Sequence, residues 1–328
     1  MVAIAAPPAS RIARESQFDC FLADQPGYLA PERLLRQASA PAGEGLRVNP
    51  RAWFSWRGPP PPAIARLLPL SDRFLADAGF VWVEDSARAT QTPFWAGPWF
   101  QKRLDALWNG EAVAGLSAHH RTALQLAQVL TSAEEDARAA AAWRASLETA
   151  SRRFRAEGWA PISGLIHPFH IDALRRYYRG LLRRGGMTLG DSGSPLRYVA
   201  HNESVARFFH SQIATAVGAI AGAPVKPSYV YVSSYQGGAD LPAHTDRAQC
   251  EYSVSLLLDY TPEPVDRSSW PLYLVTASGP VAIWQGIGDG LIYRGRELVH
   301  YRTKLPETMT STSIFFHYVD RDFRGSLD

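Results

Sequence analysis

The stretch LPAHTDRAQCEYSVSLLLDY, residues 241–260, joins a polar segment to a run of strand-forming residues. The run is rich in Val, Leu and Tyr and is typical of a β-strand. His244 and Asp246 lie two residues apart just ahead of it. Because alternate residues of a strand point to the same face, the imidazole and the carboxylate can be aimed at one point. The segment alone is compatible with a pair of metal ligands or with a polar bend between strands.

Six more runs of this character surround that strand. They are rich in β-branched and aromatic residues and are separated by Gly, Pro, Asp or Ser. Their spacing, without helical segments between them, favours an antiparallel sandwich or barrel over βαβ units. The seven runs are KPSYVYVSSYQ (226–236), CEYSVSLLLDY (250–260), WPLYLVT (270–276), GPVAIWQ (279–285), DGLIYRG (289–295), ELVHYRTK (297–304) and TSTSIFFHYV (310–319).

Upstream of these strands, helix-forming residues dominate. The segment SAEEDARAAAAWRASLETASRRFRAEG has a serine cap at Ser132, acidic residues in its first turn and arginines in its last. It predicts a helix of about 25 residues that Gly158 ends. The next segment predicts a short strand at residues 161–166, followed after a turn by a helix, and a further helix is expected at 203–221.

These patterns predict an α+β protein with two regions. Residues 1–157 form a mainly helical, Trp-rich extension, and residues 158–328 form a β-rich domain with flanking helices. Six of the ten tryptophans lie between Trp53 and Trp108. Packing is the favoured interpretation of these aromatics, while contact with a partner or a place at a substrate entrance is the alternative.

Composition excludes several classes of protein. The chain has 328 residues, 46% of them hydrophobic and 20% charged, as in ordinary globular proteins. Net charge is only +3 and the basic residues are scattered, so nucleic acid is not expected as a partner. No stretch is long and apolar enough for a membrane span, and the opening MVAIAAPPASRIARESQ lacks the pattern of a secretory signal. Two cysteines far apart in sequence favour a reducing, cytoplasmic location.

A third candidate ligand follows the His-Thr-Asp motif. His300, in ELVHYR, lies 56 residues after His244 and near the end of the strand array. A closed sandwich would bring it back beside the first strands. Two histidines and one carboxylate form the facial set that leaves three positions open on non-haem Fe(II). Catalytic zinc is usually four-coordinate and matches this set less well.

The order of HTD, GDGLIYRG, LVHYR and STSIFFHYV resembles that of the Fe(II)/2-oxoglutarate-dependent dioxygenases, prolyl-hydroxylase-like branch. The upstream segment GWAPISGLIHPFHIDALRRYYRGLL is also similar to the start of many of those domains. The resemblance covers residues 158–328 and implies a double-stranded β-helix, a jelly-roll or cupin-like fold. It implies that His244, Asp246 and His300 bind Fe(II), and that Tyr235 hydrogen-bonds the co-substrate 2-oxoglutarate.

One part of the family pattern is missing. Members usually carry Arg or Lys on the final strand to pair with the far carboxylate of 2-oxoglutarate, but this strand reads TMTSTSIFF. Arg302 shares strand parity with His300 and is the candidate replacement, with substrate binding or a structural ion pair as its alternatives. Lys304 has the same parity but lies nearer the turn. Ser313 matches a serine that some relatives use at this place.

The resemblance implies an oxygenase that hydroxylates an unactivated C–H bond of a small molecule, amino acid or peptide and releases succinate and CO2. Two alternatives stay open at this point. The first is a cupin-type metalloenzyme that does not use 2-oxoglutarate. The second is a non-catalytic binding protein whose metal only stabilises the barrel.

Overall fold

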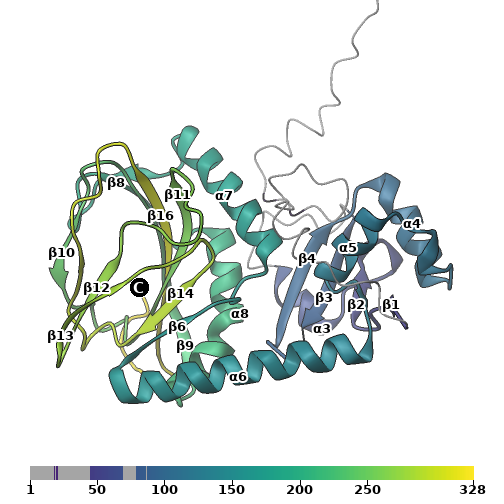
Figure 1. Cartoon of the computed structure of the whole chain (residues 1–328), viewed down its shortest axis with the longest axis horizontal. Helices are drawn as coiled ribbons and strands as arrows, with labels where there is room; N and C mark the ends of the chain where they lie inside the picture. The colour runs from purple at the N-terminus through teal and green to yellow at the C-terminus, as the bar shows by residue number, and fades with distance from the viewer. Residues whose placement is uncertain (1–17, 19, 21–44, 69–78, 86) are drawn as a thin grey trace, which may run out of the picture.

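Two facing antiparallel sheets make up the C-terminal half of the molecule (Figure 1). The computed structural model describes residues 18, 20, 45–68, 79–85 and 87–328. All seven predicted runs are confirmed as strands. They are β9 (Val225–Tyr235), β11 (Tyr252–Thr261), β12 (Leu272–Thr276), β13 (Gly279–Ile283), β14 (Gly290–Tyr293), β15 (His300–Arg302) and β16 (Thr310–Asp320).

Four short strands complete the two sheets. They are β6 (Trp159–Ile162), β7 (Thr188–Leu189), β8 (Arg197–His201) and β10 (Leu241–His244). The larger sheet has the order β6-β14-β11-β16-β9-β8-β7, and the smaller has the order β10-β15-β12-β13. Neighbouring strands in each are antiparallel. The predicted double-stranded β-helix is therefore the fold of this half.

The two faces of the larger sheet have different chemistry. Val232, Leu256 and Ile314 are paired across β9, β11 and β16, and they belong to the core that also contains Phe208 and Ile213 of α8 (Ser204–Ala221). Alternate residues on the same strands point the other way, toward the smaller sheet. These inward positions are mostly Tyr, Ser and His. The alternation thus gives the sheet one aliphatic face for folding and one polar face that lines the interior.

The predicted helices occur close to their expected positions. Helix α6 (Ala133–Glu157) has a capping box formed by Ser132 and Glu135, and Gly158 ends it in the left-handed conformation at φ 77°. Helix α7 (Pro168–Arg183) and α8 follow. The strand predicted at 161–166 is displaced: β6 ends at Ile162, because the chain turns at Gly164, where φ is +75°.

The described residues before Gly158 are mainly helical, as predicted, but they also form sheets that the sequence did not indicate. The α-helices among these described residues are α3 (Pro62–Ala65), α4 (Pro98–Trp108), α5 (Ala118–Leu126) and the whole of α6. Strands β2 (Ala52–Phe54), β3 (Phe80–Asp85) and β4 (Thr90–Trp95) form a three-stranded sheet. A short pair joins β1 (Arg47–Val48) to β5 (Leu130–Thr131).

The two regions share one hydrophobic core. Trp82 of β3 is 1% exposed and packs edge-on against Phe208 of α8, with ring centroids 6.0 Å apart. Packing is therefore the role of this tryptophan, whereas Trp108 is 41% exposed. In Figure 1, α6 runs beneath both regions. A domain boundary at residue 158 stays a prediction, since the core is continuous across it.

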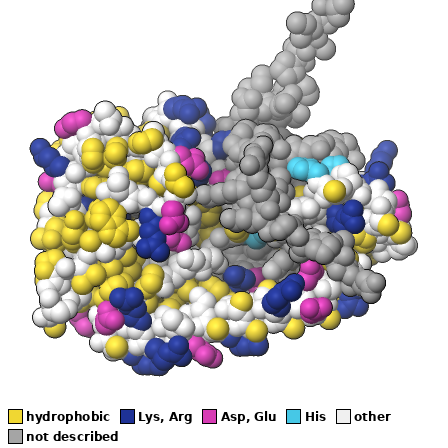
Figure 2. All heavy atoms as spheres, viewed as in Figure 1, with side chains coloured by type: hydrophobic (Ala, Val, Ile, Leu, Met, Phe, Trp, Pro, Cys, Tyr) yellow, Lys and Arg dark blue, Asp and Glu magenta, His cyan; other side chains and the backbone are white. Residues whose placement is uncertain are grey.

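Residues 1–17, which contain the opening segment discussed above, lie outside the described residues. Within the described part, no helix is both long enough and apolar enough to cross a membrane. Figure 2 shows basic side chains dispersed among acidic and apolar ones on the face in view. This dispersion agrees with the scattered charges of the sequence.

Candidate metal centre

Antiparallel pairing brings the two histidines of the candidate site together. His244 is the last residue of β10, His300 is the first of β15, and the two are register partners. Their rings lie 4.3 Å apart between centroids. Asp246 follows just beyond β10, where its backbone N–H donates to Gly295 O at 2.8 Å. The three predicted ligands are therefore neighbours, although 56 residues separate the histidines in sequence.

Backbone carbonyls orient both imidazoles. His244 Nδ1 lies 2.7 Å from Pro242 O, and His300 Nδ1 lies 3.0 Å from Leu298 O. A carbonyl only accepts hydrogen bonds, so each Nδ1 carries the hydrogen and each Nε2 keeps its lone pair. Metal-binding histidines typically have this arrangement, in which the nitrogen that does not bind the metal donates to a backbone carbonyl, here Nδ1.

Both Nε2 atoms lie near one carboxylate oxygen. Asp246 Oδ1 lies 3.8 Å from His244 Nε2 and 3.5 Å from His300 Nε2. Ligand atoms of all three residues lie within 4.8 Å of one another. Adjacent ligands about 2.1 Å from one ion would be roughly 3 Å apart, so small side-chain movements suffice for coordination.

Electrostatics favours the protonation states that a metal requires. Burial by itself raises the pKa of Asp246, but the neighbouring imidazoles of His300 and His317 and the hydroxyl of Ser253 outweigh that effect and lower the pKa overall. Burial, together with the neighbouring His300, lowers the pKa of His244. At neutral pH the site therefore presents a carboxylate anion and a neutral His244 imidazole, the forms that bind divalent metals.

A cavity of about 490 Å³ opens onto this triad. Aromatic side chains form part of its wall: Tyr229, Tyr231 and Tyr235 of β9, Tyr293 of β14 and Phe315 of β16 contribute to it. Its size falls within the range of small-molecule sites. None of the described residues that line it precedes Asp191, so the expectation that the N-terminal region shapes the entrance gains no support here. Trp284 is 45% exposed and is not a lining residue.

A hydrogen-bonded group at one side of this cavity was not predicted from the sequence. Arg197 pairs with Asp191 through Nε at 3.0 Å and Nη2 at 2.7 Å, and its Nη1 donates to Tyr235 Oη at 2.8 Å. Tyr231 Oη donates to Asp191 Oδ2 at 2.6 Å. Because Tyr235 Oη accepts from Arg197, its own hydrogen remains to be donated into the cavity.

The structure places Arg302 in the interior, as strand parity predicted. Its side chain is 3% exposed and stacks on Trp270, with Cζ 4.6 Å from the ring centroid. Nη1 donates to Trp270 O at 2.8 Å, but Nε and Nη2 have no hydrogen-bond partner among the described residues. Burial lowers the pKa of this guanidinium. Ser313 is also fully buried, and its Oγ lacks a partner within the described part of the chain.

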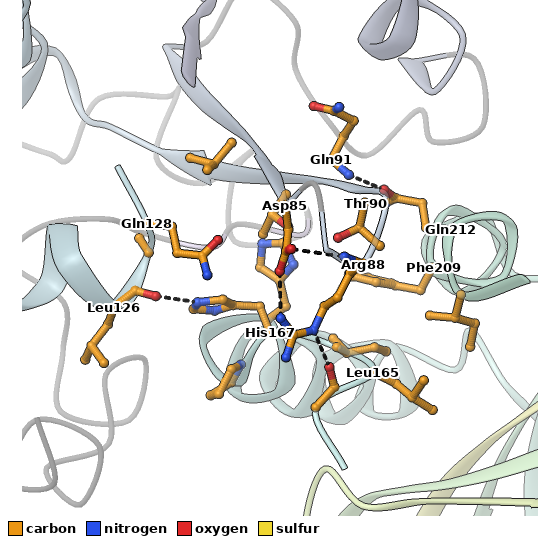
Figure 3. Close-up of a pocket in the computed structure, with 18 residues that line it drawn as sticks. Asp85, Arg88, Thr90, Gln91, Leu126, Gln128, Leu165, His167, Phe209 and Gln212 are labelled. Atoms are coloured by element: carbon orange, nitrogen blue, oxygen red, sulfur yellow. Dashed lines mark hydrogen bonds and ion pairs between the residues drawn. The ribbon is translucent and has the colours of Figure 1, made fainter. Parts of the chain in front are cut away.

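Two further histidines, His167 and His170, have structural roles. His167 accepts from Phe169 N–H as the cap of α7 and faces Leu126 O at 2.9 Å. His170 contacts Pro93 O at 2.6 Å. Both line a second cavity of about 240 Å³ between β3, β4, α7 and α8 (Figure 3). There the carboxylate of Asp85 is paired with Arg88 at 2.7 Å, so no ligand set comparable to the triad forms around it.

Comparison with known proteins gives similarity in fold. No protein-family model matches the sequence, and no curated protein matches it at a significant level. Among solved structures, the non-haem alpha-ketoglutarate-dependent epimerase SnoN from nogalamycin biosynthesis is similar at a TM-score of 0.46 and 17% identity, over 54% of this chain and 84% of that one.

Two further solved structures are similar over the same half. A prolyl-4-hydroxylase from Pseudomonas putida gives a TM-score of 0.44 at 15% identity, over 53% of this chain and 99% of that chain. HygX from Streptomyces hygroscopicus, with nickel and 2-oxoglutarate bound, gives a TM-score of 0.42 at 14% identity, over 55% of this chain and 88% of that chain. At these scores the functional assignment depends on the site itself. Fold and site together define a double-stranded β-helix with a facial His-Asp-His group.

Proposed function

We propose that this protein is an Fe(II)- and 2-oxoglutarate-dependent oxygenase that acts on a small molecule, an amino acid or a peptide. The observation that carries the proposal is the convergence of two histidine Nε2 atoms and one carboxylate oxygen beneath an open, aromatic-walled cavity. Three protein ligands on one side leave the other side to co-substrate and dioxygen. When bound, iron and 2-oxoglutarate would supply the dioxygen chemistry that oxidises a C–H bond, with hydroxylation as the proposed outcome.

The binding of 2-oxoglutarate is supported by the buried guanidinium of Arg302. A buried charge without a counter-charge is destabilised by several kcal/mol, about 3–5 in measured cases. The far carboxylate of 2-oxoglutarate would supply that counter-charge and accept from the two unpartnered donors, Nε and Nη2. Arg197 is the less suitable cation, because Asp191 already neutralises it. Lys304 is exposed and lies outside the interior.

Two hydroxyl groups can complete this anchor. Tyr235 is fully buried and has a hydrogen to donate, because its oxygen accepts from Arg197. Ser313 Oγ is buried and lacks a partner among the described residues. Each would donate to a carboxylate oxygen, and charge-assisted hydrogen bonds of this kind are stronger than neutral ones. Tyr235, Arg302 and Ser313 are therefore the proposed co-substrate residues, and His244, Asp246 and His300 the proposed iron ligands.

The same observations weigh against the two alternatives. A metal that only stabilises a fold is usually enclosed by four protein ligands, whereas this triad faces a cavity. A metalloenzyme without 2-oxoglutarate would leave the charge of Arg302 without an anionic partner in the part of the chain described here.

The test is anaerobic addition of Fe(II) and 2-oxoglutarate to the purified protein. Chelation of Fe(II) by the keto acid gives a weak visible charge-transfer band, which we expect in the wild type and not in Asp246→Ala. Metal binding without the band would remove 2-oxoglutarate from the proposal. If the wild type binds no metal, the proposal as a whole is wrong.

A further inference from the structure

The two oxygens of Asp246 have different surroundings. Oδ1 faces the imidazoles of His244 and His300. Oδ2 accepts a hydrogen bond from Ser253 Oγ at 2.7 Å. Ser253 lies on β11, points into the interior and is fully buried. One carboxylate oxygen is thus directed at the metal position while a buried hydroxyl holds the other.

His317 continues this arrangement on the neighbouring strand. Ser253 and His317 are register partners across β11 and β16, and His317 Nδ1 lies 2.9 Å from Ser253 Oγ. A serine hydroxyl has one hydrogen, and the carboxylate, which only accepts, takes it. Ser253 Oγ must therefore accept from His317, so that Nδ1 carries the hydrogen.

The backbone and the ring of His317 each have a further contact. Its backbone O accepts from His210 Nε2 at 2.7 Å, and the ring of Tyr229 lies 4.6 Å away between centroids. Burial lowers the pKa of His317 to about 4, so the ring is neutral at physiological pH. With Nδ1 protonated, Nε2 of this cavity-lining residue keeps its lone pair.

We propose that Ser253 and His317 are positioning residues that hold Asp246 as a one-oxygen ligand through the chain Nδ1–H···Oγ–H···Oδ2. The inference rests on the proposed function, because it concerns how the iron site is kept open. Carboxylates bind metals through one or both oxygens. A carboxylate that rotated to bind through both would occupy a position that the co-substrate needs, and the bond from Ser253 opposes that rotation.

The strand offers a matched control. Ser255 is the next inward residue on β11, is equally buried, and its Oγ has no hydrogen-bond partner among the described residues. Ser253→Ala and Ser255→Ala therefore remove the same atom from the same face of the same strand. Only the first removes a bond to Asp246.

The experiment is a titration of the metal-free protein with Co(II). Competition with a chelator gives the affinity, and the visible spectrum reports the coordination of the ion. The urea midpoint of the metal-free protein shows whether each variant is still folded. Loss of a hydrogen bond that orients a ligand weakens metal binding by about 10- to 100-fold. We expect this loss and an altered Co(II) spectrum for Ser253→Ala, with Ser255→Ala within about twofold of the wild type. A second pair tests the histidine. His317→Phe should weaken Co(II) binding, whereas His317→Asn, whose amide N–H lies near the position of Nδ1, should restore most of it.

The outcomes separate this inference from the proposed function. If the wild type binds Co(II) and Ser253→Ala binds it equally well with the same spectrum, Ser253 does not position Asp246. If His317→Phe binds Co(II) as tightly as the wild type, the histidine only fills space and does not position Asp246 through Ser253. Absence of Co(II) binding by the wild type would instead overturn the proposed metal site.

Discussion

Gly295 is the position at which substitution by alanine, which adds one methyl group, should disrupt metal binding. A Cβ added there would lie 2.6 Å from Ser253 Oγ and 2.6 Å from Cys250 O, and closer still to Asp246 Oδ2, whereas ordinary contact begins at 3.4 Å. The φ angle of Gly295 lies outside the left-handed region, so alanine fits the backbone. Relief must therefore come from the neighbouring atoms, which have to retreat by roughly 0.8 Å or more.

This displacement falls on the proposed ligand itself. Disturbing the groups that orient a metal ligand weakens metal binding by about 10- to 100-fold, so we expect Gly295→Ala to weaken Co(II) binding by about 100-fold, the upper end of that range. Crowding in a packed interior destabilises by about 1–3 kcal/mol, which leaves a folded protein measurable by urea unfolding. Calorimetric titration with Co(II) gives the affinity.

Gly115 supplies the comparison for this variant. A Cβ at Gly115 would meet nothing nearer than a Glu111 oxygen at 3.6 Å, so Gly115→Ala should leave the affinity for Co(II) unchanged. If Gly295→Ala binds Co(II) as tightly as the wild type while remaining folded, the described position of Asp246 against Gly295 is wrong. Metal affinity that falls equally in both variants would also contradict the argument.

Two further predictions concern buried charge. Arg302→Met, which removes the unpaired guanidinium, should lower the affinity for 2-oxoglutarate by at least about 100-fold, yet lower the free energy of unfolding by no more than about 1 kcal/mol. The exposed control Lys304→Met should change neither quantity. Normal affinity for 2-oxoglutarate in Arg302→Met would exclude Arg302 as the anchor. Burial lowers the pKa of His170 from 6.5 to about 3, so between these values only the unfolded state takes up the proton and stability falls as pH falls. Protonation of this histidine in the unfolded state should therefore lower the free energy of unfolding by about 2 kcal/mol between about pH 7.5 and pH 5. In His170→Gln the urea midpoint should fall correspondingly less over the same pH range. A fall as large as that of the wild type would refute the lowered pKa of His170.

Local patterns in the sequence accounted for most of the C-terminal half. Strand runs bounded by Gly, Pro and Asp were found because the alternation of their side chains is a local property. The helix after Ser132 was predictable for the same reason, since its cap and its terminal Gly158 lie within the helix segment. Parity along β15 was enough to predict that Arg302 points inward with His300, and both are buried.

Contacts between distant segments were not predictable in this way. Ser253 resembles any other small polar residue on a strand, and its bond to His317 depends on the register of β11 against β16. A bulge near Leu257 interrupts that register, and no local signal in the sequence gave its position. The pairing of Arg197 with Asp191 depends similarly on how the turn before β8 folds back. The short strands β2 to β4 were missed because their aromatic residues were interpreted as packing or binding groups and not as strand-forming residues.

The two-faced sheet has a consequence for how such a protein can diversify. On β16, Ile314 and Phe316 belong to the core against the helices, while Phe315 and His317 line the cavity. Stability and chemistry are thus encoded at interleaved positions of one strand, with little overlap between them. Replacement of a cavity residue changes what the interior can accommodate without opening a gap in the helix-facing core. A lineage could therefore change the shape of the cavity through Phe315 while Ile314 and Phe316 preserve the fold.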